Sequence, residues 1–358
     1  MANIYGLLGL ADGQRVMLSQ LGQTVVYDAV TQYLTSYNEE VNTMLRIFVG
    51  ETTSDYKRRY VLPGGGMLQR RGGQAQSAAV KATGQWDVAF PLEEYGAQIA
   101  SDLVSFAYMS TNDLARHVDS VRIQDLNTTR FEVLRALLNN TARSWSDPLW
   151  GALTIQPLAN GDATTYPPVL GAQAEATENH YLESGYAASA ISDTNDPIVT
   201  IVDELQEHFG APTGGGNIVV FVNQAQRAKL AGLIEFADLP DSFIRVGANT
   251  AVPEALPAGL PGRVIGRHNS GAWIVEWRHM PANYLAGIDL DAPAPLVRRI
   301  DPADTGLPQG LTLISDSSEY PFVQSHYMNR HGFGVGNRLN GVIMELGTGG
   351  TYTVPAGY

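Results

Sequence analysis

A glycine- and arginine-rich stretch, PGGGMLQRRGGQ at residues 63–74, is the part of this sequence that most invites a chemical role. Glycine runs can surround a phosphate group, and paired arginines can bind an anion. A phosphate-binding loop, however, needs glycines that lead directly into Lys-Ser or Lys-Thr at the start of a helix. These glycines lead into Met-Leu-Gln-Arg-Arg and then into further glycines, so the stretch does not fit a nucleotide site.

Histidine and carboxylate spacing gives no sign of a metal or catalytic centre. Neither His-Glu-x-x-His nor another paired-ligand spacing occurs on a convincing helix, so we expect surface or interface roles for the seven histidines. The stretch 193–196, Asp-Thr-Asn-Asp, precedes Pro197 and lacks the glycine and glutamate of a calcium loop, so it fits a helix cap better. There is also no cysteine and no Gly-x-Ser-x-Gly elbow. We therefore expect no catalytic residue, no metal, no cofactor and no enzymatic activity.

Charge is distributed unevenly along the chain. The net charge is −13, which argues against a general nucleic-acid binder because such proteins need clustered cations. Between Glu51 and Lys81, however, six cations stand against two carboxylates, a local charge of +4. These cations are Lys57, Arg58, Arg59, Arg70, Arg71 and Lys81. A basic projection on an acidic body suits a partner with an acidic surface, such as another copy of the same chain.

The first hundred residues are expected to give an arm, a helix and a long β projection. Residues 1–25 show no strong period, whereas apolar residues in three- and four-residue steps predict an amphipathic helix over 25–49. YKRRYVLP and WDVAFPL are then typical of strands, with 22 residues between them. Because a tight hairpin needs only about two to five loop residues, we expect an extended two-stranded projection. An isolated ribbon is marginally stable, so a neighbouring subunit is expected to cover it.

A long helix is predicted directly after the projection, over residues 110–145. Ser110 and Asp113 form a capping-box pattern at its start. Such a helix would be about 50 Å long, and a break near residues 127–129 stays open as an alternative. Beyond it we expect a short helix from Pro197, a buried strand with a second short helix at its end, and a mostly β C-terminal third. GFGVGNR, at 332–338, alternates glycine with apolar residues, which is typical of a strand that another backbone approaches closely.

The order of these parts resembles the major capsid proteins of tailed bacteriophages, which have the Hong Kong 97-type fold. NIVVFVNQAQRAKLAGL, at 217–233, looks like the strand and short helix of that family's axial domain. FVQSHYMNRHGFGVGNRLNGVIMEL, at 322–346, looks like its closing segment. The resemblance implies an α+β fold with an N-terminal arm, an extended β-hairpin called the E-loop, a long spine helix in a peripheral domain, and an α/β axial domain.

The same resemblance divides the chain into five segments. They are an N-terminal arm and helix at 1–48, the E-loop projection at 49–95, a peripheral domain at 96–194 with its spine helix at 110–145, an axial domain at 195–310, and a β-rich C-terminal return at 311–358.

The function that the resemblance implies is structural. Copies of the chain would self-assemble through hexamers and pentamers into an icosahedral shell that encloses viral double-stranded DNA without sequence-specific binding. The chain would assemble in the host cytoplasm and end in the virion, with no membrane partner. No long helical segment precedes the arm, so we expect a separate scaffolding protein, together with a portal and a decoration protein.

In that family the E-loop lies across the neighbouring subunit, which implies subunit-contact roles for two kinds of residue. The glycines would let the tip change its angle between precursor and expanded shells, and the cations would meet acidic surface on the next copy. The residues concerned are Lys57, Arg58, Arg59, Gly64, Gly65, Gly66, Arg70, Arg71, Gly72 and Gly73. Some members cross-link a lysine to an asparagine after expansion, and Lys81 lies at a suitable position.

Three alternatives stay open from the sequence. An encapsulin-type nanocompartment shell shares the fold and would need a pocket for cargo peptides. A soluble α/β enzyme or glycan-binding protein would form a monomer or small oligomer with a pocket of convergent polar groups. The glycine-rich stretch itself would, in the plainest alternative, be a disordered surface loop.

Overall fold

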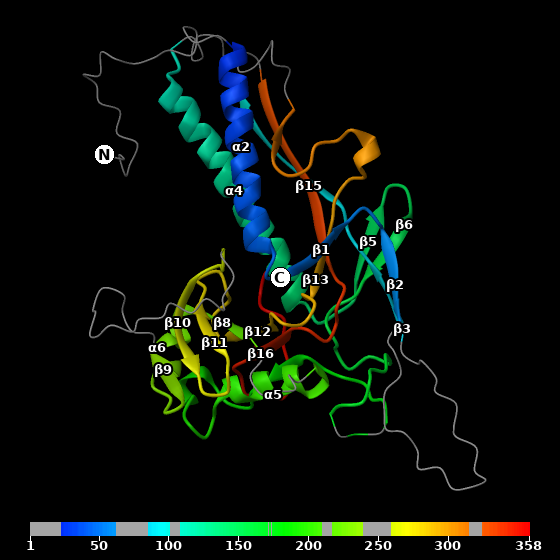
Figure 1. Ribbon diagram of the computed structural model, residues 1–358, viewed down its shortest axis with the longest axis vertical. Coiled ribbons are helices and arrows are strands. Elements are labelled where there is room, and N and C mark those ends of the chain that lie inside the picture. Colours follow the sequence, from blue (N-terminus) through cyan, green and yellow to red (C-terminus); the bar gives the residue numbers. More distant parts are fainter. Residues whose placement is uncertain are drawn as a thin grey trace, which may run out of the picture. The chain divides into compact units, whose positions relative to one another are not determined.

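The computed structural model of the chain has a mixed α+β fold (Figure 1). It describes residues 23–61, 85–100, 108–170, 172, 174–209, 217–238, 259–314 and 324–358. The chain divides into two compact units, each built from separate stretches of sequence. The first unit comprises residues 1–41, 93–129 and 301–330, and the second comprises residues 42–92, 130–300 and 331–358. The five segments expected from the sequence stay a prediction.

A seven-stranded sheet forms the centre of the second unit in the described part of the chain, with strand order β7-β16-β12-β8-β11-β10-β9. All five side chains of β8 are buried, as expected for a strand that is covered on both faces. This strand runs parallel to β11 and antiparallel to β12. The strands are β7 (Tyr181–Glu183), β8 (Ile218–Val222), β9 (Phe236–Asp238), β10 (Arg263–His268), β11 (Trp273–Glu276), β12 (Tyr284–Asp289) and β16 (Val342–Glu345).

Helix α5 (Pro197–Phe209) packs on this sheet, as the sequence predicts. It begins where the Asp196 carboxylate accepts a hydrogen bond from the Ile198 amide at 2.8 Å, which confirms the cap expected there. Its apolar face joins the core of β8 and β12, and a Cβ at Gly287 would lie 2.2 Å from Ile201 Cγ2. The remaining short helices of the described residues are η1 (Ala188–Ala190), η2 (Gln224–Gln226), α6 (Arg227–Leu230) and η3 (Ala303–Thr305).

Outside the seven-stranded sheet, the described residues of the second unit form two separate antiparallel hairpins. Strands β2 (Lys57–Val61) and β3 (Gln85–Ala89) pair with Val61 opposite Gln85, which confirms the two strands expected at the base of the projection. The connection between them, residues 62–84, lies outside the described residues. Strands β5 (Arg143–Asp147) and β6 (Gly151–Ile155) form the second hairpin.

A further set of strands contains the glycine-rich residues 332–335, for which the sequence predicts the close approach of another backbone. In the second unit, β1 (Val49–Thr53) runs parallel to β13 (Leu296–Arg299), which pairs antiparallel with residues 332–335 of β15 (Gln324–Val335). A Cβ at Gly332 would lie 2.1 Å from the carbonyl oxygen of Pro91. A Cβ at Gly334 would lie 2.7 Å from the ring of Phe90. The alternating glycines therefore admit neighbouring backbone and ring atoms, as expected.

The first unit contains most of helices α2 (Gln23–Leu45) and α4 (Thr111–Leu138). The Tyr33 hydroxyl donates to Asp119 at 2.6 Å, and the Tyr37 hydroxyl donates to Asp125 at 2.8 Å, so the two helices lie side by side (Figure 1). Strands β4 (Glu93–Ala100) and β14 (Thr312–Leu313) pair with β15 in this unit. None of the described helices has both the length and the apolar character needed to cross a bilayer.

The helix predicted over 110–145 is shorter than expected. It ends at Leu138, and residues 143–145 lie in β5 instead. The Asn139 side chain accepts a hydrogen bond from the Thr141 amide at 2.9 Å, and this local turn competes with further helix. The 28 residues of α4 correspond to about 42 Å, and the helix runs without a break through residues 127–129. The first helix also ends before residue 49, at Leu45.

Candidate functional site

The base of the β2–β3 hairpin holds the three described cations of the predicted contact set. Arg59 lies directly opposite Asp87 in the strand register, and its guanidinium donates to that carboxylate at 2.6 and 3.0 Å. Lys57 Nζ lies 2.8 Å from the same carboxylate. The hydrogen bonds from Arg59 and then Lys57 hold the pKa of Asp87 well below its usual range.

Arg58 is paired on the other side of the ribbon. Its Nε lies 2.7 Å from Asp55, its Nη2 donates to Thr53 Oγ1 at 2.8 Å, and its Nη1 forms an ion pair with Glu51. All three described cations therefore have carboxylate partners in the same unit. The local charge of +4 counted between residues 51 and 81 did not include Asp87, which β-pairing brings to Lys57 and Arg59.

The tip of the projection lies outside the described residues. This holds for Gly64, Gly65, Gly66, Arg70, Arg71, Gly72, Gly73 and the cross-link candidate Lys81. Lys57, Arg58 and Arg59 have carboxylate partners within their own unit, and the subunit-contact role expected for them, like that of Arg70 and Arg71, stays a prediction.

Aromatic stacking fixes the hairpin base. The rings of Tyr60 and Trp86 face each other across the two strands with centroids 5.6 Å apart, and Trp86 in turn contacts the ring of Tyr166 at 5.8 Å. Trp86, Val88 and Phe90 of this segment belong to one buried cluster. These contacts join the hairpin base to the buried core of the second unit.

A groove of about 840 Å³ runs beside the hairpin base. Its charged lining residues are Arg46, Glu51, Arg58 and Asp289, and two of these, Glu51 and Arg58, are paired with each other. Much of the remaining lining is apolar, as at Tyr60 and Trp86. This composition favours a contact surface over an active site, which needs polar groups that converge on a substrate.

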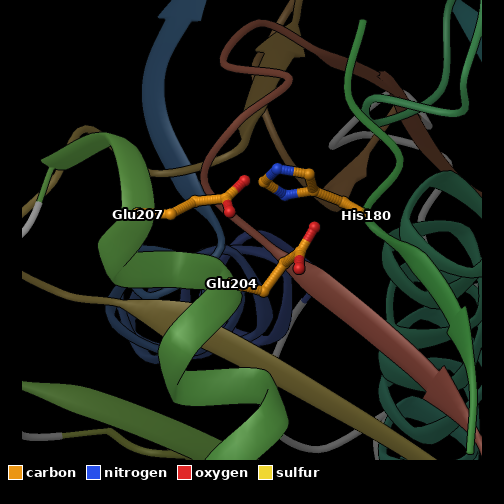
Figure 2. Close-up of side chains that lie close together, drawn as sticks. All are labelled: His180, Glu204 and Glu207. Carbon is orange, nitrogen blue, oxygen red and sulfur yellow. The ribbon is translucent and has the colours of Figure 1, made fainter. Parts of the chain in front are cut away.

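Elsewhere in the second unit, three side chains form a group that the sequence did not indicate. Figure 2 shows the ring of His180 and the carboxylates of Glu204 and Glu207 turned toward one another. Their potential ligand atoms all lie within 4.8 Å of one another. His180 directly precedes β7 and is fully buried, and the two glutamates lie one turn apart on α5. Burial, together with Glu207 and Glu178, raises the pKa of Glu204 to about 7.

The expectation of surface or interface roles for the histidines is wrong for three of them. His180, His268 and His331 have exposed fractions of 0%, 1% and 0%. His268 Nε2 lies 2.9 Å from the capping carboxylate of Asp196, which gives this histidine a structural role at the start of α5. The sequence could not reveal their burial, because the groups around these rings come from distant parts of the chain: Gly341 beside His180, Asp196 beside His268 and Arg298 near His331.

No protein-family model matches this sequence, and no curated protein matches it either. Among solved structures, one from Mycobacterium phage Patience is similar over 95% of this chain and 92% of its own, with a TM-score of 0.64 and 21% identity. The mature capsid of bacteriophage PhiM1 gives a TM-score of 0.49 at 11% identity, over 82% of this chain and 83% of its own. The holo-SrpI encapsulin complex from Synechococcus elongatus gives 0.42 at 8% identity, over 84% and 86%.

The TM-scores of the last two structures are too low to assign a fold, so of these three structures the first alone is used to describe the fold of this chain. At 21% identity, it shows that the chain shares its α+β fold with a phage structure.

Proposed function

We propose that this chain is the major structural subunit of a tailed-phage head with the Hong Kong 97-type fold. Its copies assemble through hexamers and pentamers into a closed icosahedral shell around double-stranded DNA. The observation that carries the proposal is the fold shared with the structure from Mycobacterium phage Patience, which extends over 95% of this chain and 92% of that one. A likeness of that extent covers nearly the whole of both chains rather than one common motif.

The order of the described elements supports the same role. A paired hairpin base with residues 62–84 between its strands precedes the long helix α4, and α5 with the seven-stranded sheet follows. In the proposal these are the E-loop, the spine helix and the axial domain. The five segments named from the sequence, at 1–48, 49–95, 96–194, 195–310 and 311–358, are the corresponding parts.

The proposed contacts between copies are made by the tip of the E-loop. Arg70 and Arg71 bind acidic surface on the neighbouring subunit, and Gly64–Gly66 with Gly72 and Gly73 let the tip change its angle on expansion. Lys81 is the candidate for a covalent link to an asparagine of another copy. A net charge of −13 suits a container, because it limits binding of the wall to the enclosed DNA. A scaffolding protein, a portal and a decoration protein are the proposed partners.

Particle size tests this proposal. We expect the purified chain, expressed alone or with a candidate scaffolding protein, to sediment as particles or capsomer rings that negative-stain electron microscopy resolves. A homogeneous species of one to four subunits under both conditions would contradict a shell role. It would favour the alternative of a small oligomer that binds a ligand, for which the groove beside the hairpin is the candidate site. The contents separate the two kinds of shell, since DNA identifies a phage head and a packaged enzyme identifies an encapsulin-type compartment.

A further inference from the structure

We propose that His180, Glu204 and Glu207 bind one divalent transition-metal ion, for which Zn²⁺ is the best-suited probe. The site lies entirely within the second unit and is independent of the proposed shell role.

The donor atoms are already close enough to share an ion. One ligand atom from each residue lies within 4.8 Å of the other two. Ligand atoms around a tetrahedral Zn²⁺, at about 2.0–2.1 Å from the metal, lie roughly 3.4 Å apart. Rotation of the two glutamate side chains would close that difference, since both project from one face of α5 toward the ring (Figure 2).

The imidazole of His180 is held as a metal-binding histidine usually is. Its Nδ1 lies 2.9 Å from the carbonyl oxygen of Gly341, and a carbonyl can only accept, so Nδ1 carries the hydrogen. In the neutral ring, Nε2 then keeps the lone pair that a metal ion needs. A backbone carbonyl on the second ring nitrogen fixes the orientation of many histidine ligands. The ring is also fully buried, which excludes a role as a solvated surface residue.

A third carboxyl group lies beside the site. Glu178 joins the group through a hydrogen bond between its carboxyl group and that of Glu207. A mixed nitrogen and oxygen ligand set suits Zn²⁺ and its first-row neighbours, whereas Mg²⁺ and Ca²⁺ prefer oxygen alone.

A bound ion would connect α5 to the sheet. The backbone of His180 is part of the sheet edge, because its amide donates to Ala159 at 2.8 Å and its carbonyl accepts from Ile343 at 2.8 Å. Glu204 and Glu207 belong to the helix. The ion would therefore cross-link two elements that are otherwise joined by apolar packing, and it would stabilise the folded chain through its binding.

Calorimetric titration of the chelator-treated full chain with ZnCl₂ tests the site. We expect one Zn²⁺ per chain, and about tenfold weaker binding or worse in each of E204Q and E207Q, which keep the side-chain shape and remove a ligand charge. The matched control is D203N, which makes the same charge change on the exposed side of the same helix and should leave the affinity unaltered. Addition of CoCl₂ to the native chain should give visible absorption bands that the double variant E204Q/E207Q lacks.

Two results would overturn the proposal. The first is the absence of both Zn²⁺ heat and Co²⁺ bands in the native chain, which would mean that the carboxyl groups only share a proton. The second is equal Zn²⁺ affinity in the native chain and E204Q/E207Q, or an equal loss in D203N, which would place the binding elsewhere. The absence of both signals in the native chain overturns the proposal without any variant, and E204Q and E207Q can be compared singly with D203N if the double variant fails to fold.

Discussion

A single buried guanidinium organises the loop that leads from β6 toward β7. Arg338 is fully buried, and it donates to the carbonyl oxygens of Pro157 and Leu158 at 2.9 and 3.2 Å. It also donates to Asp162 at 2.8 Å and lies over the ring of Tyr166. No local pattern in the sequence indicates that an arginine 176 residues further along the chain than Asp162 holds this loop.

Replacement of Arg338 by lysine should therefore be costly although the charge is kept. One ammonium group cannot satisfy the several acceptors that the planar guanidinium reaches, so we expect R338K to lower the unfolding free energy by about 2–4 kcal/mol. Urea unfolding of the purified chain measures this difference. The control is R116K, which alters an exposed ion pair with Asp113 and should cost less than about 1 kcal/mol. Similar losses in both variants would contradict the assigned role.

Another buried residue, His331, links stability to pH. Burial, and then the charge of Arg298, lowers its pKa to about 3, whereas the unfolded chain has an ordinary histidine with a pKa of about 6.5. Between these values the unfolded state binds the proton and the folded state does not. The folded state is therefore favoured above pH ~6.5 and loses up to about 1.4 kcal/mol per pH unit below it, until the folded pKa is reached.

We expect H331Q to remove this contribution to the pH dependence. The unfolding free energy of the native chain, measured in urea near neutral pH and near pH ~5, should fall more steeply on acidification than that of H331Q. Each protein is compared with itself at two pH values, so an overall loss of stability in the variant does not affect the result. Parallel pH profiles for the two proteins would show that His331 does not carry the effect.

At the scale of elements, the start of α4 is an instance where local sequence specifies structure. The Ser110 hydroxyl accepts from the Asp113 amide at 3.3 Å, while the Asp113 carboxylate accepts from the Ser110 amide at 3.1 Å. This reciprocal pair is the capping box that the sequence predicts. Both partners lie within one turn, so no tertiary information is needed to find them.

Removal of this cap should destabilise the first unit modestly. We expect S110A to cost about 1 kcal/mol, because the Asp113 amide loses its side-chain acceptor and the Asp113 carboxylate loses the hydroxyl donor. The matched control is S120A, the same substitution at an exposed position in the middle of α4, which should be neutral or slightly stabilising. Chemical unfolding of both variants provides the comparison, and an equal loss in the two would argue against the cap.

The elements that the sequence predicted share a local signature, and those it missed depend on distant partners. The hairpin strands, α5 with its Asp196 cap, the buried β8 and the glycine-spaced β15 all follow from short patterns. The end of α4 is an exception, because the turn at Asn139 and the β5–β6 hairpin that follow it are both local. The charge pairs of Asp87 and the group around His180 were not visible, since they require strand register or tertiary packing.

At the scale of the whole molecule, the tip of the projection is where copies are proposed to meet. We expect the double reversal R70E/R71E to impair particle formation while the subunit stays folded, because it places negative charge against acidic surface. R70K/R71K is the matched control, which keeps the charge and should still assemble. Sedimentation reports assembly, and far-ultraviolet circular dichroism reports folding. Particles of normal yield from R70E/R71E would contradict the proposed role of these arginines.

Cryo-electron microscopy of the sedimenting fraction tests the shell role most directly. The account predicts a closed icosahedral particle in which each β2–β3 hairpin extends residues 62–84 across the adjacent subunit. A particle without icosahedral symmetry, or a small discrete oligomer with its groove open to solvent, would contradict it.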